Sequence, residues 1–166
     1  STIDASATDN GHGGKVVLWS DVHNASSVTT VYGTIYAKGG TNGGDGGQVE
    51  TSGHVLKVDS ISVSTASLYG KAGDWLLDPY DIHINANGGN YSGSTTIISN
   101  GSNDGVNSYI GHTVIENALV NNNVTVQSSS GYNINIQADG QISSASSNTL
   151  TLNSGKDITV EYYAPN

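Results

Sequence analysis

The sequence predicts an all-β fold of the β-solenoid type. Short apolar clusters are separated by Gly, Asn and Ser along most of the chain, and short strands with frequent turns favour an all-β architecture. Many clusters alternate apolar with polar residues, which is the period of a half-buried strand. A Gly-rich turn that leads into a short strand also recurs every ~25–33 residues, a spacing typical of solenoids, in which stacked coils bury one another's apolar faces.

The expected strands are the apolar clusters themselves. In chain order they are Val16–Trp19, Val31–Tyr36, Gln48–Thr51, Val55–Val58, Ile61–Val63, Trp75–Leu77, Ile82–Ile84, Thr95–Ile98, Val124–Gln127, Ile134–Gln137, Thr149–Leu152 and Ile158–Glu161. The stretches Asn85–Gly93 and Asn100–Asn107 are expected to be long polar loops.

The Asp78-Pro79 dipeptide marks a corner between two of these strands. Pro79 has no backbone N–H to donate, and it disfavours helix at Asp78, so the chain should turn there and continue extended. We therefore expect the chain to pass from one sheet to the next at this point. Trp75, in the strand before the corner, is predicted to be buried. Both Trp75 and Trp19 lie in strand runs, which favours a stacked core ladder or a corner plug, with a sugar platform as the alternative.

The internal repeat supports stacked coils. Its Gly-rich form is carried by Gly13–Val17, Gly46–Glu50 and Gly70–Trp75, and a shorter form recurs at Asn133–Ile136, Asn148–Leu152 and Lys156–Val160. One stretch breaks this pattern and predicts a short helix near residues 113–121, lying against the side of the solenoid. Thr113 is the expected N-cap, Glu116 would complete a capping box, and Asn121–Asn123 would end the helix.

The composition of the chain excludes several kinds of partner and of binding site. We expect the 166 residues to form a single domain, 1–166. The chain has no Phe, no Met and 22 Gly, so its core must be built in thin layers from Val, Ile, Leu and Ala. The net charge is −9 and every basic residue is Lys, which disfavours nucleic acid and anionic membrane surfaces as partners. No apolar run reaches ~18 residues, so no membrane insertion is expected, and the absence of Cys excludes a disulfide framework.

No catalytic, cofactor-binding or metal-binding residue is predicted, and the chain is not expected to be an enzyme. The densest acidic group, Asp74, Asp78 and Asp81, surrounds the proline corner, where Asp commonly bonds nearby backbone N–H groups. The five histidines lack zinc-site spacing, and His83 is expected to point outward between two apolar neighbours. In Gly43–Gly47 the Asp stands at the wrong offset for a calcium repeat, so these glycines favour a left-handed turn.

Three tyrosines are the candidate ligand-binding residues. Tyr80, Tyr162 and Tyr163 could stack on a sugar, because an exposed Tyr offers an aromatic face and a hydroxyl. The alternative reading of all three is an ordinary surface tyrosine.

The chain resembles the filamentous haemagglutinin-like exoproteins of Gram-negative bacteria. The resemblance rests on Gly13–Ser20, Tyr32–Gly40, Gly43–Gly53 and Gly70–Pro79, and continues through Ile115–Leu119, Asn123–Gln127, Asn148–Leu152 and Lys156–Val160. It implies a right-handed parallel β-helix, export by two-partner secretion, an extracellular or bacterial cell-surface location, and a role in adhesion, aggregation or biofilm formation. The family's secretion domain has no counterpart here, so the outer-membrane transporter is expected to be a partner of a full-length precursor only.

Together these observations predict a structural shaft segment of a secreted adhesin or extracellular fibre. One alternative is a self-assembling subunit of an extracellular filament, joined end to end. Another is a carbohydrate-binding β-helix module that recognises cell-surface glycans or receptors. Ser1–Asp4 and Ile158–Tyr163 both have the pattern of strands without a polar cap, which favours self-association or further coils on both sides.

Overall fold

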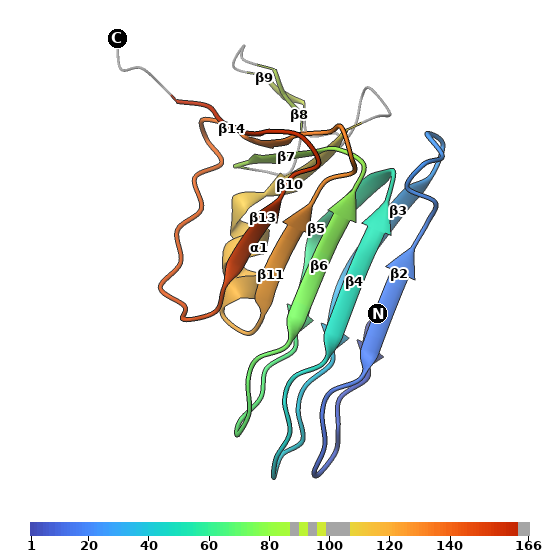
Figure 1. Ribbon diagram of the computed structural model, residues 1–166, viewed down its shortest axis with the longest axis vertical. Helices are drawn as coiled ribbons and strands as arrows, with labels where there is room; N and C mark the ends of the chain where they lie inside the picture. Colours follow the sequence, from blue (N-terminus) through green and yellow to red (C-terminus); the bar gives the residue numbers. More distant parts are fainter. Residues whose placement is uncertain (87–89, 93–95, 99–106, 163–166) are drawn as a thin grey trace.

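The computed structural model describes residues 1–86, 90–92, 96–98 and 107–162 (Figure 1). Over these residues the chain is mostly β-strand with one short helix. The elements are β1 Thr2–Asp4, β2 Lys15–Trp19, β3 Val28–Tyr36, β4 Gln48–Gly53, β5 Val55–Ser64, β6 Asp74–Pro79, β7 Ile82–Asn85, β8 Asn90–Ser92, β9 Thr96–Ile98, β10 Ser108–Gly111, α1 His112–Leu119, β11 Asn123–Gln127, β12 Ile134–Ile136, β13 Leu150–Asn153 and β14 Ile158–Val160.

Strands far apart in the sequence pair in parallel. The five-stranded sheet has the order β13-β11-β6-β4-β2, the four-stranded sheet β10-β7-β12-β14, and the three-stranded sheet β1-β3-β5, while β8 and β9 form an antiparallel pair. In Figure 1 the five-stranded sheet faces the viewer, with β2 at one edge and β13 at the other. The predicted strand-rich, parallel architecture is confirmed. The sheets do not close into a solenoid in the described residues, so the right-handed β-helix stays a prediction.

The parallel strands are in register, so inward side chains form columns across the sheets. The inner column of the five-stranded sheet consists of Val16, Val49, Trp75, Val124 and Leu150. In the four-stranded sheet, Ile82 and Ile134 are fully buried and align with Ile158. The inward apolar side chains of each strand are therefore buried beside those of the neighbouring strands, as the period-two pattern predicts.

The proline corner is confirmed. Strand β6 ends at Pro79 in the five-stranded sheet, and β7 begins at Ile82 in the four-stranded sheet. Trp75 is buried, with only 1% of its surface exposed, and its indole Nε1 donates to the Thr51 hydroxyl at 3.1 Å. The prediction for Trp19 is wrong, because this side chain is 64% exposed. Its neighbour Leu18 occupies the inward position of β2, so Trp19 must point outward.

The helix is confirmed at His112–Leu119, but two of its predicted details are wrong. The N-cap is Gly111, which makes no side-chain capping bond, and Glu116 instead accepts from the Ser143 backbone N–H at 2.7 Å. The helix lies beside β5, at the edge of the three-stranded sheet. It packs against β5 and buries Ile115, Ala118 and Leu119 in the core, so it takes the place beyond β5 that a strand would otherwise fill.

The recurrent glycines precede β2, β4 and β6 and touch backbone in the neighbouring turn. Gly47 donates to the Ala37 carbonyl at 2.7 Å and accepts from the Asp74 N–H at 3.0 Å. Gly44 has φ of 114°, which confirms the left-handed turn expected in Gly43–Gly47. Glycine is thus needed here for two reasons, conformation at Gly44 and close backbone approach at Gly47.

Several strand boundaries differ from the sequence prediction. The clusters Val55–Val58 and Ile61–Val63 belong to one long strand, β5. Strand β10 was not predicted, because its four residues are all buried and show no alternation. The expected loop Asn85–Gly93 contains the end of β7 and the strand β8, and most of the expected loop at 100–107 lies outside the described residues, as does Thr95.

Candidate functional site

Tyr80 lies in an aromatic column just beyond the proline corner. Its ring stacks on His54 at a centroid distance of 4.2 Å and tilts against Tyr132 at 3.9 Å. Its hydroxyl donates to the Tyr132 hydroxyl at 2.5 Å, and this bond raises the pKa of the Tyr80 phenol. A sugar could reach only the part of the ring that these two neighbours leave open.

The other two tyrosines are not brought together with Tyr80 into one described site. Tyr162 is 81% exposed beyond the last strand, and Tyr163 lies outside the described residues. The sugar-binding role assigned to these tyrosines therefore stays a prediction.

The carboxylates around the corner have different partners. Asp81 accepts from the Ile82 N–H at 2.9 Å, as expected of a turn residue, and its other oxygen lies 3.7 Å from His83 Nε2. Asp74 accepts from the Asn123 side-chain amide at 3.3 Å. Asp78 is half-buried in the five-stranded sheet, and burial raises its pKa, with a smaller contribution from the nearby charge of Glu50.

The histidines are held in separate local contacts. His83 points away from the core as predicted, but its ring stacks on Tyr109 at 4.8 Å, so it is largely covered. His54 Nδ1 lies 2.8 Å from the Val22 carbonyl oxygen, and His112 Nδ1 lies 3.1 Å from Glu116. Across the described ranges, no three His, Cys, Asp or Glu side chains come together as a metal-binding group.

Asp59 is a further perturbed carboxyl that the sequence did not single out. Part of its side chain reaches solvent, but the surrounding strands desolvate the carboxylate and raise its pKa to about 6. The Gly111 N–H donates to it at 3.3 Å and opposes this shift. Asp59 thereby joins the end of β10 to the middle of β5, a structural role that accounts for its position.

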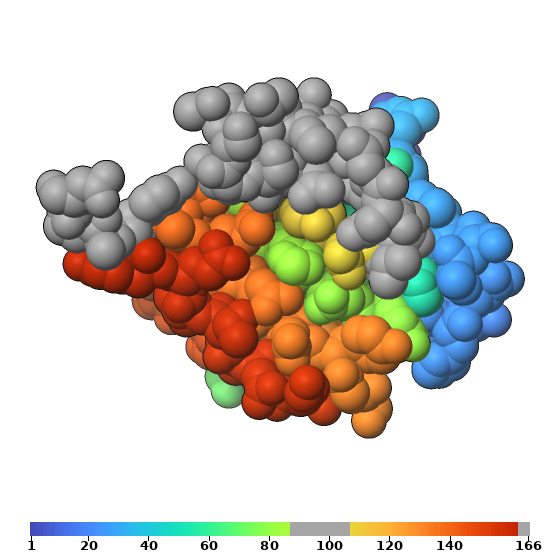
Figure 2. Space-filling model, turned by 90° about the horizontal axis from the view of Figure 1, so that it is seen from above, coloured from blue at the N-terminus to red at the C-terminus, as the bar shows by residue number. Residues whose placement is uncertain are grey.

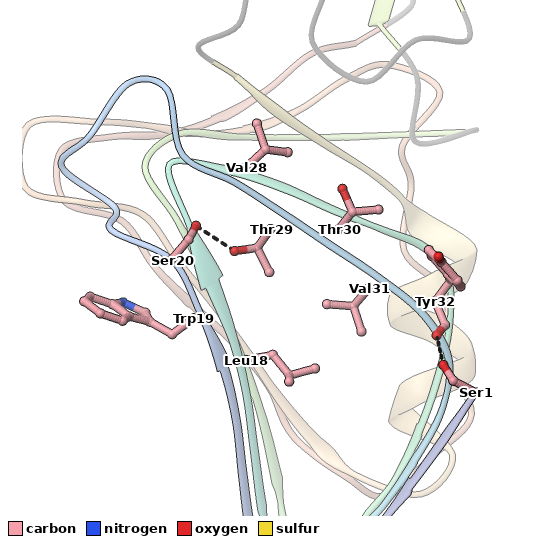
Figure 3. A pocket seen from close by; sticks show the side chains of 9 residues that line it. All are labelled: Ser1, Leu18, Trp19, Ser20, Val28, Thr29, Thr30, Val31 and Tyr32. Carbon is pink, nitrogen blue, oxygen red and sulfur yellow. Dashed lines mark hydrogen bonds between the residues drawn. The ribbon is translucent and has the colours of Figure 1, made fainter.

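The N-terminal end of the stack carries a hollow. Figure 3 shows that Leu18 and Val31 point into the space between β2 and β3, while Trp19 points away from it. The hollow has a volume of about 490 Å³ and is lined by Ser1, Leu18, Trp19, Ser20, Val28, Thr29, Thr30, Val31 and Tyr32. Strand β2 is also an edge of the five-stranded sheet, so one side of its backbone has no strand neighbour in the described residues.

The other end of the stack exposes apolar strand residues. Ile158 is 47% exposed and Val160 is 69% exposed, although both continue the columns that bury Ile134 and partly bury Ile136. Strands β13 and β14 are the edges of their sheets. Figure 2 shows the N-terminal residues (blue) and the C-terminal residues (red) on opposite sides of the molecule. The two apolar edges therefore face in different directions and could meet those of neighbouring coils.

The outward position of Trp19 could have been found from the repeat. Aligning the Gly-rich turns before β2, β4 and β6 places Val16 with Val49 and Trp75, and Trp19 with Ser52 and Asp78. The charged residue in the second set, Asp78, indicates an outward position. The adjacent apolar run in β2 obscured this signal.

Comparison with known proteins gives no family for the chain: no protein-family model matches it, and a search of curated proteins finds no match. The described part of the chain holds no helix with the length and apolar character needed to span a bilayer.

Proposed function

We propose that the chain is a structural shaft segment of a secreted bacterial adhesin or extracellular fibre, folded as a right-handed parallel β-helix. The observation that supports this most is the in-register parallel pairing of strands from successive repeats, which gives continuous buried columns through the five-stranded sheet. Such stacking can be extended at either end without changing the local contacts. In this role the chain contributes length and surface, and no enzymatic step is assigned to it.

Secretion and adhesion are supported by the resemblance to filamentous haemagglutinin-like exoproteins. Immunogold electron microscopy on the bacterium that makes the chain tests this location, using an antibody raised against the purified protein. Gold is expected on the cell surface or on secreted filaments, and deletion of the gene should reduce aggregation or biofilm. Label confined to the cell interior, with unchanged aggregation, would contradict the proposal.

A second candidate function is end-to-end assembly of copies into a filament. The apolar edge at β13 and β14 and the hollow beside β2 and β3 favour it, because each leaves apolar side chains exposed at the edge of a parallel sheet. Continuing the inner column would place Leu150 of one copy beside Val16 of the next. Thr151 would then lie beside Val17 on the outer side of the sheet.

This register predicts a specific intermolecular disulfide. Because the chain has no Cys, the double variant Val17→Cys/Thr151→Cys can form only engineered bridges. Neighbouring strands lie ~4.8 Å apart, within the Cα separation that a disulfide tolerates. Oxidation at high protein concentration should give a ladder of covalent oligomers on a non-reducing gel.

The matched control is Val17→Cys/Thr159→Cys, since Thr159 lies on an edge strand of the other sheet. It should give little oligomer. Equal cross-linking in both variants, or none in the first, would count against the proposed assembly.

A further inference from the structure

The outer face of the five-stranded sheet, defined here as the surface its strands turn away from the core, carries ordered rows of side chains. Parallel, in-register pairing aligns outward residues of equal level across the strands. One row runs through Val17, Glu50, Leu76, Thr125 and Thr151. The next runs through Trp19, Ser52, Asp78, Gln127 and Asn153, of which Ser52 is fully buried.

Trp19 stands out on this face. The other tryptophan, Trp75, is buried on the inner side of the same sheet, whereas Trp19 is 64% exposed beside the half-exposed Val17. A strand added next to β2 would cover its backbone edge and Leu18, and would reduce the exposure of Trp19, since Asp78 and Gln127, which have strand neighbours on both sides, are half-buried in the same row. The edge position of β2 thus contributes to the exposure of Trp19, but the outward direction of the ring does not depend on it.

A shallow trough crosses the same face. On β2 it is lined by Lys15, two rows from Trp19, and it reaches the row of Trp19 at Gln127 on β11. Its volume is about 350 Å³, and it is lined by Lys15, Gln48, Val49, Glu50, Asp74, Leu76, Thr125 and Gln127. The lining combines an apolar floor at Leu76 with carboxylate, amide and hydroxyl groups. Two of these groups are fixed by bonds within the face, since Ser52 donates to Glu50 at 2.9 Å and Asn153 donates to Gln127 at 2.9 Å.

The negative charge of the trough disfavours acidic ligands. Glu50 and Asp74 outnumber Lys15, the half-buried Asp78 adds a further carboxylate beside Glu50, and the whole chain carries a net charge of −9. An acidic polymer would be repelled by this surface. A neutral polyhydroxylated ligand could use the carboxylates and amides as hydrogen-bond partners, with an aromatic ring as its apolar platform.

The spacing of the rows suits a polymer. Adjacent strands lie ~4.8 Å apart, so an extended polysaccharide laid across the strands can meet side chains of several strands along its length. We propose that the outer face binds a neutral polysaccharide, with one sugar ring on Trp19 and the following sugars bonded by Glu50 and Gln127. This proposal does not depend on the shaft function, and a failure of one leaves the other standing.

Intrinsic fluorescence of the purified chain tests the proposal directly, because the two tryptophans differ so strongly in exposure. The probes are cellohexaose, mannohexaose and chitohexaose as neutral oligosaccharides, with hexagalacturonate as the acidic comparison. At least one neutral hexamer should shift the emission to the blue and protect it from acrylamide at millimolar concentration. A Trp75→Phe variant should keep this signal, because it comes from Trp19 alone.

Affinity measured by calorimetry should fall about tenfold or more in Trp19→Ala, the loss expected when a stacking contact worth ~1.4 kcal/mol is removed. Glu50→Gln should weaken binding less, and Tyr69→Ala, which removes an exposed aromatic side chain outside the trough, should leave it unchanged. Full binding by Trp19→Ala, preferential binding of hexagalacturonate, loss of binding in Tyr69→Ala alone, or no response to any neutral hexamer would overturn the proposal. Concentration-dependent burial of Trp19 without sugar would also overturn it, by assigning the face to a second copy of the chain.

Discussion

Replacing Trp75 by Ala is expected to lower the free energy of unfolding by about 3–5 kcal/mol, the usual cost of removing a buried Trp side chain. The indole fills the inner column between Val49 and Val124, both of which are themselves buried. Its loss would leave a cavity in the middle of the five-stranded sheet and would remove the hydrogen bond that the indole Nε1 donates to the Thr51 hydroxyl. Urea unfolding followed by circular dichroism measures the change.

Two variants make this measurement specific. Trp75→Phe should cost less, since most of the side-chain volume is kept, while the bond to Thr51 and a smaller part of the packing are lost. Trp19→Ala removes the same side chain from an exposed position and should change stability by less than about 0.5 kcal/mol. If Trp75→Ala were no less stable than Trp19→Ala, the packing of the inner column described above would be wrong.

The repeated elements of this fold were predictable because each repeat carries its own local signal. Alternation in Ile134–Ile136 fixes which side chains face inward, and the proline corner fixes where the chain changes sheet. The Gly-rich turns mark the start of β2, β4 and β6. None of these signals depends on residues far away, so sequence alone was enough to find them.

Contacts between distant residues were not predictable in the same way. Asn122 is fully buried after the helix, where its amide nitrogen donates to the Val63 and Ala118 carbonyls. Its side-chain oxygen accepts from both the backbone N–H and the hydroxyl of Thr65. In the sequence this residue is one of three consecutive asparagines, which predict only that the helix ends there. Its role depends on the packing of α1 beside β5, and no local sequence pattern indicates that packing.

In the candidate site, too, local features were predictable and contacts between distant residues were not. Tyr80 was singled out as an exposed aromatic residue, but its partners His54 and Tyr132 come from other repeats and occupy its faces. Conversely, Trp19 was placed in the core because β2 is apolar at four consecutive positions, Val16–Trp19. The register with β4 and β6, which the aligned Gly-rich turns also predict, shows that it shares a row with polar residues.

The close approach of neighbouring turns predicts that Gly47→Ala will be among the most damaging single substitutions. A Cβ atom at position 47 would lie 2.0 Å from the Gly14 carbonyl oxygen and 2.6 Å from the Gly13 carbonyl carbon. Both are backbone atoms, so no side-chain rotation can relieve the overlap. The turns before β2 and β4 would have to separate, which would strain the bond from the Gln48 N–H to the Gly14 carbonyl, now 3.0 Å, and those Gly47 makes with Ala37 and Asp74.

We expect Gly47→Ala to cost about 4 kcal/mol or more, or to prevent folding, as substitutions with large steric conflicts do. Gly131→Ala is the matched control. Gly131 has φ of 88° but no atom within 4 Å of its added Cβ, so it should lose only about 1–2 kcal/mol from backbone strain. Circular dichroism reports folding, and urea midpoints compare any variants that fold. A Gly47→Ala protein as stable as Gly131→Ala would show that the turns have room between them, and the recurrent glycines would then have to be explained by backbone conformation instead of by the stacking of neighbouring turns.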